Sequence, residues 1–253
     1  MEDIVLDGFA SWVGNSSAET TVRAYQKNED GIFANLMEAK FVMVSLDYND
    51  LKQTLPLPSL KCETSEEGVQ NTKQLKSGTS TSLLFKPPTA EEAIWRVLGP
   101  NQVPIGDTIK STSHLCFPQN RNYFGNIFGD YIMRIGVEST WRAALAFAKS
   151  QISIISINNV KFIKPVSVGS ILDITSTVTY VKGPCMQVRV FFECSCPTNS
   201  FKPYTSNTMQ VTFKCPTVKH VPELVPQLYN HGMLYLNGKR YFQKGCKRSS
   251  IRI

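Results

Sequence analysis

The sequence lacks a hydrophobic run long enough to cross a lipid bilayer. A membrane-spanning helix needs about 20 consecutive apolar residues, whereas the longest apolar stretch, residues 152–157, is interrupted by Ser153 and Ser156. The 253 residues are 42% hydrophobic and 19% charged, which is typical of chains that form a packed core. We therefore expect a globular protein with no membrane span.

Metal-binding and disulfide patterns are also missing. The chain has seven cysteines, an odd number, and no CxxC pair matched by a second pair of metal ligands. Cys194 and Cys196 form a CxC that a strand would place on one face, but only three histidines are available to join them. We expect reduced thiols in an intracellular compartment, no metal and no bound cofactor.

The N-terminal segment has neither the basic start of a secretory signal nor the Arg-rich pattern of a transit peptide. As written, the chain is expected to carry no N-terminal targeting signal.

Positive charge is concentrated at the C-terminus. Lys and Arg total 27 against 20 Asp and Glu, a formal net charge of +7. Residues 239–253 contain no acidic residue and six basic ones: Lys239, Arg240, Lys244, Lys247, Arg248 and Arg252. The rest of the chain is nearly neutral. Nucleic acid or an anionic membrane would suit such a tail, but only Tyr241 and Phe242 interleave its charges, so we expect a solvated tail and no nucleic-acid partner.

Composition divides the chain into four regions. Residues 1–50 predict strands, notably 22–25 and 39–46, and residues 51–106 form a Pro- and Ser-rich linker with a short helix over 89–98. Residues 107–220 form the most structured domain, and residues 221–253 are a C-terminal extension with the basic tail.

The third region predicts a long helix followed by strands. Residues 130–149 contain no Pro, and Met133, Val137, Trp141, Ala144 and Ala148 recur at helical spacing. Ile132, Ile135, Leu145 and Phe147 flank them, so a mostly buried helix is expected. Breaks rich in Pro and Gly then separate four strand candidates, at 152–163, 171–181, 186–196 and 206–215. A long helix followed by strands able to wrap around it predicts an α+β domain.

A weak internal repeat relates the first region to the third. Residues 12–14 and 22–24 resemble 180–183 and 188–190, and residues 38–44 occupy the place of 207–213 in the second copy. The first copy therefore corresponds to the last strands of a domain whose helix is not present, and such a domain cannot close its own core.

Residues 118–133 read PQNRNYFGNIFGDYIM. This segment resembles the signature of double hotdog acyl-CoA thioesterases, which consists of PQ-x-R-N, a short loop and N-x-F-G-G at the start of a long helix. Residues 161–172 resemble the turn after the first strand beyond that helix. Residues 11–14, 41–44 and 233–238 are similar to stretches of the mitochondrial acyl-CoA thioesterase 9/10 branch. The resemblance covers nearly the whole chain and implies an α+β hotdog fold, one complete hotdog preceded by the terminal strands of another.

The resemblance implies hydrolysis of fatty acyl-CoA to a free fatty acid and CoA, in a mitochondrion, with CoA as part of the substrate. By resemblance, Asn122 is the catalytic asparagine. The alternative is that Asn122 is a loop residue whose side chain only satisfies its own turn. Asn126 is expected to stabilise a turn or to cap the helix. Gly129 allows close approach to backbone amides at the helix start, which suit a developing oxyanion.

Two departures from the family pattern concern acidic residues near the expected site. Asp130 replaces the second glycine of the motif and places a negative charge beside the expected thioester, so it would serve as a base or impair the site. In related enzymes the asparagine of one hotdog works with an acid on the other hotdog's helix. Val137 occupies the position of that acid here.

Glu138 is the remaining carboxylate on this helix. Its simplest role is an i,i+4 ion pair with Arg142, and the alternative is a catalytic role across a homo-oligomer. Arg121, Lys161 and Lys164 flank the motif loops and are candidates for binding CoA phosphates. The sequence leaves open a second function, a truncated hotdog protein that binds acyl-CoA or self-associates without turnover.

Overall fold

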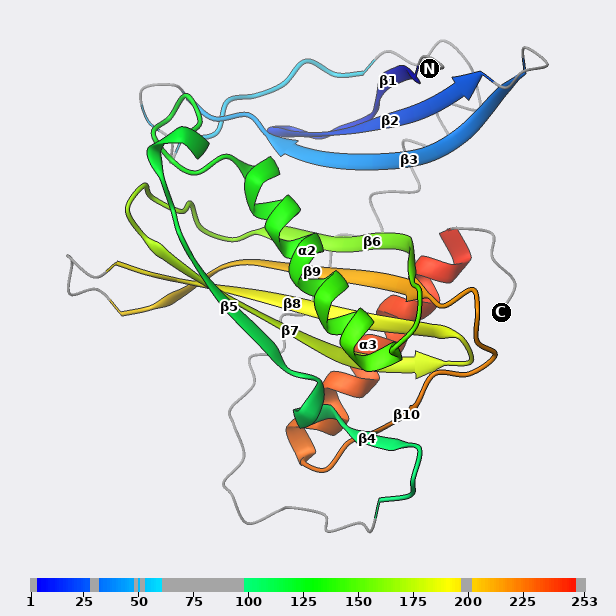
Figure 1. Cartoon of the computed structure of the whole chain (residues 1–253). Helices are drawn as coiled ribbons and strands as arrows, with labels where there is room; N and C mark the ends of the chain where they lie inside the picture. The colour runs from blue at the N-terminus through cyan, green and yellow to red at the C-terminus, as the bar shows by residue number, and fades with distance from the viewer. Residues whose placement is uncertain are drawn as a thin grey trace. The chain divides into compact units, whose positions relative to one another are not determined.

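The computed structural model describes residues 4–27, 32–47, 50, 53–60, 98–196 and 202–248, the side chains of 247 and 248 excepted. The chain divides into two compact units, residues 1–85 and 86–253. Figure 1 shows the strands and helices of each unit. No helix within the described ranges is both long enough and apolar enough to cross a membrane.

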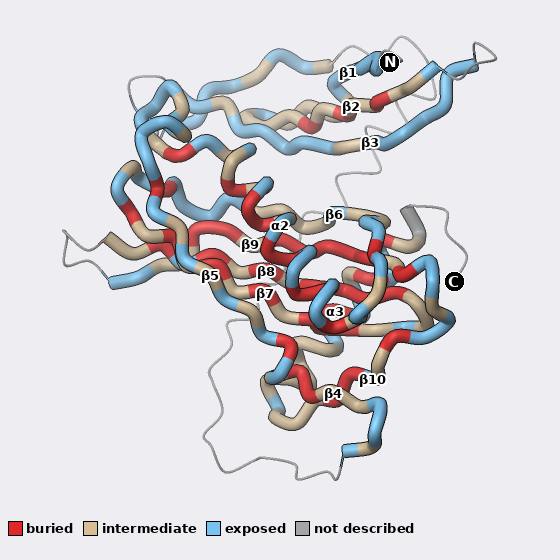
Figure 2. The backbone as a smooth tube through the Cα atoms, viewed as in Figure 1, coloured by how far each residue is buried: buried red, intermediate tan, exposed pale blue. Residues whose placement is uncertain are grey.

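The first unit contains a three-stranded antiparallel sheet. Strands β1 (Ile4–Val13), β2 (Ser17–Lys27) and β3 (Phe33–Val44) lie in chain order. Both outer strands are exposed along most of their length (Figure 2). Their exposed side chains include the apolar Leu6 and Val42. Strands β7, β8 and β9 of the second unit have the same consecutive order.

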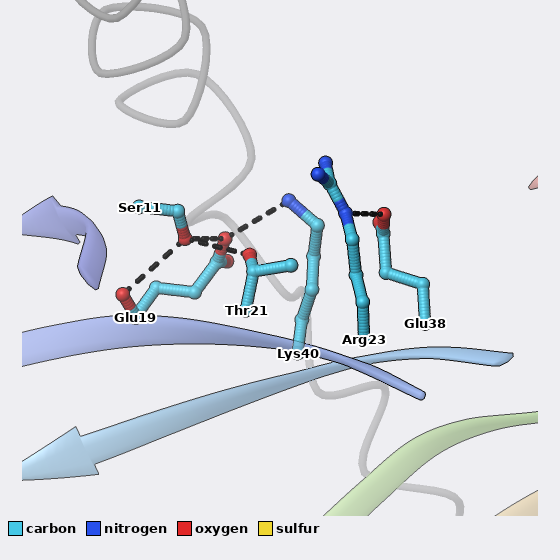
Figure 3. A network of polar contacts seen from close by, with 6 residues as sticks. All are labelled: Ser11, Glu19, Thr21, Arg23, Glu38 and Lys40. Carbon is cyan, nitrogen blue, oxygen red and sulfur yellow. Dashed lines mark hydrogen bonds and ion pairs between the residues drawn. The ribbon is translucent and has the colours of Figure 1, made fainter. Parts of the chain in front are cut away.

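Polar side chains link all three strands of this first sheet (Figure 3). Glu19 on β2 is buried; its Oε1 accepts hydrogen bonds from Ser11 Oγ on β1, at 2.8 Å, and Lys40 Nζ on β3, at 3.1 Å. Arg23 Nε pairs with Glu38 Oε2 at 3.1 Å. Because a buried carboxylate is costly without partners, these contacts favour a single register of the strands.

The second unit is built on a five-stranded antiparallel sheet. Its strands are β5 (Lys110–Leu115), β6 (Ser153–Phe162), β7 (Ile171–Lys182), β8 (Cys185–Ser195) and β9 (Tyr204–Lys214), in the order β5-β7-β8-β9-β6. A parallel pair, β4 (Gln102–Pro104) and β10 (Glu223–Val225), lies outside this sheet. Two short 3-10 turns, Ile105–Thr108 and Pro118–Asn120, flank β5.

Helix α2 (Gly129–Ala148) packs on one face of the sheet and α3 (Tyr229–Arg248) on the other (Figure 1). Strand alternation separates the two faces. Met186, Val188 and Val190 of β8 belong to the core beneath α2, whereas Gln187, between them, joins a polar network with Gln210 and Thr212. The α+β architecture and the four strands after the helix agree with the sequence prediction to within two residues at each end.

The buried face of α2 agrees with the predicted one only in part. Trp141 is 38% exposed and lies at the rim, edge-on to the ring of Phe213. The buried residues are Ile132, Ile135, Gly136, Ser139, Thr140, Ala143, Ala144 and Phe147. Small residues turn toward the sheet because they let the helix approach closely, and a Cβ added at Gly136 would lie 2.6 Å from the Phe192 ring. The helix was predicted correctly. Of its predicted stripe, Ala144 is buried and Met133, Val137 and Ala148 are half-buried, so the stripe was wrong only at Trp141.

The prediction of a solvated C-terminal tail was wrong for residues 239–248. They belong to α3, which covers the polar face of the sheet. The side chains of Lys239, Arg240 and Lys244 are nevertheless exposed, so the positive charge faces solvent. The helix predicted over 89–98 lies outside the described residues, apart from Leu98.

Candidate active site at the start of helix α2

The loop before α2 is held in place by backbone hydrogen bonds to a second loop, residues 163–170. Ile127 N donates to Val166 O at 2.8 Å, and Cys116 N donates to Ser170 O at 2.9 Å. Gly169, with φ +83°, returns a hydrogen bond from its N–H to Cys116 O at 2.8 Å. The two segments that carry the sequence resemblance are therefore neighbours in space and together fix the chain as it enters the helix.

The Asn122 side chain forms hydrogen bonds within the loop that precedes α2. Its Oδ1 accepts hydrogen bonds from the backbone amides of Phe124, at 2.9 Å, and Asn126, at 3.0 Å. Asn122 N also donates to Asn126 O at 2.7 Å. The asparagine therefore satisfies its own turn, as the structural alternative predicted. Because these bonds use the oxygen alone, the Nδ2 group is the part of this half-buried side chain that can serve a substrate.

The start of α2 presents backbone donors. Phe128, the N-cap residue, makes no side-chain hydrogen bond to the first turn, so the N–H groups of Gly129 and its successors lack the usual capping partner. Gly129 has the Phe162 ring beside it, 3.1 Å from the place a Cβ would occupy. Asp130 is exposed in the first turn, where the helix dipole favours a carboxylate.

Glu138 lies far from this helix start. It is nine positions beyond Gly129, which is about 13 Å along a helix axis. The predicted ion pair with Arg142 is not formed; Arg142 Nη2 donates instead to Ser111 O on β5, at 3.1 Å. The structure thus brings Asn122, Gly129 and Asp130 to one end of the helix and leaves Glu138, which is exposed, in its middle.

The three candidate ligands for CoA phosphates come from the two loops and from the end of β6 next to them. Arg121 is exposed and its backbone bridges to Ile127. Lys161 is half-buried near the end of β6, and Lys164 Nζ lies 5.2 Å from the ring centroid of Tyr204. Tyr204 OH donates to Pro165 O at 2.8 Å, which ties β9 to the same loop.

The cysteine beneath the loops is not a nucleophile. Cys116 is 1% exposed, and burial raises the pKa of its thiol to about 11, so it stays protonated at neutral pH. The part of the chain that the structure describes contains no group of three residues able to hold a metal ion.

A polar residue missed by sequence reasoning lies close to the helix start. Asn207 on β9 pairs in register with Phe162 on β6, and both line a small cavity against Ile132 and Met133 of α2. The sequence places Asn207 within a strand but gives no sign that its carboxamide is buried.

The fold defined by these elements, a long helix against an antiparallel sheet, is the hotdog fold. A structure of an acyl-CoA hydrolase from Staphylococcus aureus, in complex with butyryl-CoA, CoA and CoA disulfide, is similar with a TM-score of 0.54 at 23% identity, covering 58% of this chain and 92% of that chain. An acyl-CoA hydrolase from Bacillus cereus gives a TM-score of 0.54 at 18% identity, covering 59% of this chain and 93% of that chain.

The chain is homologous to the mitochondrial acyl-CoA thioesterases 9 and 10, which confirms the resemblance. It is 31% identical to mouse mitochondrial acyl-CoA thioesterase 10 over 265 residues, 96% of this chain and 60% of the relative. It is 31% identical to human mitochondrial acyl-CoA thioesterase 9 over 99% of this chain and 62% of the relative. The chain thus spans about three fifths of the length of these relatives. No family model matches it.

Proposed function

We propose that this chain hydrolyses acyl-CoA thioesters at the start of α2. The observation that carries the proposal is the Asn122 loop, which holds a side-chain amide donor beside a helix start that lacks a side-chain cap. Such donors suit the oxygen of a thioester carbonyl as it gains negative charge. Homology to acyl-CoA thioesterases over nearly the whole chain supports acyl-CoA as the substrate class.

The reaction proposed for this site is attack by water. A new bond forms between the water oxygen and the carbonyl carbon, the bond from that carbon to sulfur breaks, and the water proton passes through a base to the CoA thiolate. Asn122 Nδ2 and the amides of the first helical turn stabilise the oxyanion. No bound cofactor or metal takes part in these steps.

The base is proposed to be a carboxylate on α2. Asp130 is the carboxylate in the first turn, whereas Glu138, about 13 Å further along the axis, would reach this site only from a second copy of the chain. Arg121, Lys161 and Lys164 are the side chains proposed for the CoA phosphates, because cations around the two loops offset the polyanionic end of the substrate.

Two isosteric variants identify the base. If Asp130 accepts the proton, Asp130→Asn lowers kcat by about 10²- to 10⁴-fold while Glu138→Gln leaves it unchanged. The opposite pattern assigns the base to Glu138 of a second copy. Unchanged kcat in both variants contradicts a carboxylate base on this helix. Release of CoA thiol from short, medium and long acyl-CoAs, by the wild type and both variants, is the measurement.

A second candidate function is binding of acyl-CoA without turnover. Asp130 favours it, because an exposed carboxylate beside the helix start opposes both the oxyanion and the anionic CoA. On this alternative, Asp130→Gly strengthens CoA binding in calorimetry while thiol release stays at background in every form of the chain.

The assembly and compartment are proposed from the relatives. A hexameric acyl-CoA thioesterase shares the fold, with a TM-score of 0.55 at 22% identity, and β6 pairs only with β9 among the described strands. Both features support a homo-oligomer. The mitochondrial relatives support a mitochondrial location.

A further inference from the structure

Tyr204 contacts the loop 163–170 through both its hydroxyl and its ring. It is half-buried at the start of β9 and packs against the core of the second unit. Its OH donates a hydrogen bond to Pro165 O at 2.8 Å, and Lys164 Nζ lies 5.2 Å from the centroid of its ring. Burial is the main cause that raises the pKa of the phenol, so the hydroxyl keeps the proton that it donates. One side chain of the sheet thus contacts two consecutive residues of the loop.

These two residues lie next to the junction of the loop with the chain that enters α2. Ile127 N donates to Val166 O at 2.8 Å, and Val166 directly follows Pro165. Lys164 is two residues before this junction, and Gly129, the first residue of the helix, is two residues beyond it. In acyl-CoA the pantetheine arm separates the thioester from the phosphates. A cation that binds the phosphates is therefore expected beside the helix start and not at it, which is where Lys164 lies.

Lys164 is the candidate phosphate ligand whose side chain is already oriented. Its ammonium faces an aromatic ring and forms no ion pair with any described residue. Within the described ranges, the side chains of Arg121 and Lys161 make no hydrogen bond, ion pair or ring contact. A lysine loses rotamer freedom when it binds an anion, and a ring contact formed beforehand reduces that loss. An ammonium held in this way, without an acidic partner, is available to an anionic ligand.

We propose that Tyr204 is a positioning residue that holds Lys164 where it meets a phosphate group of CoA. The ring orients the ammonium, and the hydrogen bond to Pro165 O fixes the backbone next to it. Tyr204 acts through Lys164 and does not itself touch the substrate. The inference rests on the proposed function, because it concerns the phosphate end of the same substrate.

Calorimetry with free CoA as the probe tests this role without turnover. Lys164→Met keeps the unbranched stem but removes the charge, and we expect it to bind CoA about ten-fold more weakly than the wild type. Tyr204→Leu removes the ring and the hydroxyl, and we expect a loss of about two- to five-fold. In the double variant the loss is expected to equal that of Lys164→Met alone, because Tyr204 acts only through the lysine. A purely structural role of Tyr204 would add its own loss instead.

Helix α3 offers matched control variants. Lys244 Nζ lies 5.7 Å from the centroid of the Tyr241 ring, which is the same kind of contact on a helix that packs against the opposite face of the sheet from α2. Lys244→Met and Tyr241→Leu should therefore bind CoA as the wild type does.

Thermal midpoints show whether each variant folds. Tyr204→Phe, which keeps the ring and loses only the hydrogen bond to Pro165 O, is a milder second variant, and its smaller loss of CoA binding should also disappear in the Lys164→Met background. Unchanged CoA binding in Lys164→Met, a Tyr204 loss that persists at full size in that background, or no CoA binding by the folded wild type would each overturn the inference. Hydrolysis of butyryl-CoA is scored separately, and its absence alongside the expected CoA results contradicts the proposed hydrolysis alone.

Discussion

His231 is a half-buried base near the start of α3, and its Nδ1 atom is buried without a hydrogen-bond partner among the described residues. Its ring lies against Gly106, where an added Cβ would be 3.5 Å from Cε1. Burial lowers the pKa of this imidazole below its ordinary value of 6.5. The folded protein therefore holds His231 neutral under conditions in which the unfolded chain binds a proton.

The sign of the resulting pH dependence follows from proton binding. The unfolded state binds more protons below about pH 6.5, so the contribution of His231 to stability is present above that pH and is lost as the pH falls. We expect urea unfolding midpoints to decrease from pH 7.5 to 5.5, and His231→Gln to decrease less. His220→Gln, at an exposed position, is the matched control substitution. If the unfolding midpoint fell equally with pH in the wild type and in His231→Gln, His231 would not be the source of the pH dependence.

Single residues differ in how far their sequence predicts them. Asn122 could be found because its motif is contiguous and ends at a helix start. The ion pair of Glu138 with Arg142 was wrong because helical spacing ignores the neighbouring strand, whose Ser111 carbonyl takes the guanidinium. Asn207 was missed because burial of its amide depends on β6, β8 and α2, which meet only in the folded protein.

At the scale of elements, α3 depends on glycines at its contact with the sheet. A Cβ at Gly238 would lie 2.5 Å from Thr179 Oγ1 and 3.0 Å from the Thr179 carbonyl carbon. A Cβ at Gly245 would lie 2.6 Å from Ser156 Oγ. These residues weaken helix propensity, but they allow the helix to approach the sheet closely.

Gly238→Ala is expected to destabilise the protein in spite of the better helix propensity of alanine. The clash involves backbone as well as side chain, so we expect a loss of roughly 1–3 kcal/mol in unfolding free energy. Gly232→Ala on the same helix meets no atom within 4 Å and is expected to stabilise by up to about 1 kcal/mol. Urea denaturation of the two variants provides the comparison, and equal effects would show that α3 does not depend on this close contact.

In the first unit, the predicted strands at 22–25 and 39–46 lie within β2 and overlap β3. In the second unit, the elements predicted from sequence are those with a clear hydrophobic period. Helix α2 and strands β6 to β9 show such a period, and Pro and Gly residues mark the turns between them. Strand β5, KSTSHL, was not predicted because it is almost wholly polar and becomes a strand by pairing with β7. Helix α3 resembled a tail because its glycines lower helix propensity and its basic residues indicated a solvated segment.

At the scale of the whole molecule, the two units differ in how completely they bury apolar surface. The second unit has a closed core around α2. The sheet of the first unit exposes apolar side chains on both outer strands, as expected for terminal strands of a hotdog. In the second unit, β6 is an edge strand with Ile154 and Ile157 each 38% exposed.

A charge on the β6 edge is expected to weaken self-association. Edge strands pair readily with other strands, and charged side chains oppose such pairing. We expect the wild type to sediment as an oligomer and Ile157→Lys to shift it toward monomer without loss of thermal stability. Leu115→Lys, on the opposite edge strand β5 and 47% exposed, is the control. A monomeric wild type, or equal dissociation by both variants, would contradict assembly through β6.

Asn122→Asp tests whether the Asn122 side chain donates a hydrogen bond to the thioester at the start of α2. Aspartate keeps an oxygen for the amides of Phe124 and Asn126, so the loop should persist, but it lacks the Nδ2 donor. The measurement is CoA thiol release from butyryl-CoA by wild type and variant at equal thermal stability. We expect turnover in the wild type and a loss of about 10²- to 10³-fold in kcat in the variant. Equal turnover by the two proteins, or none by a folded wild type, would contradict this role of Asn122.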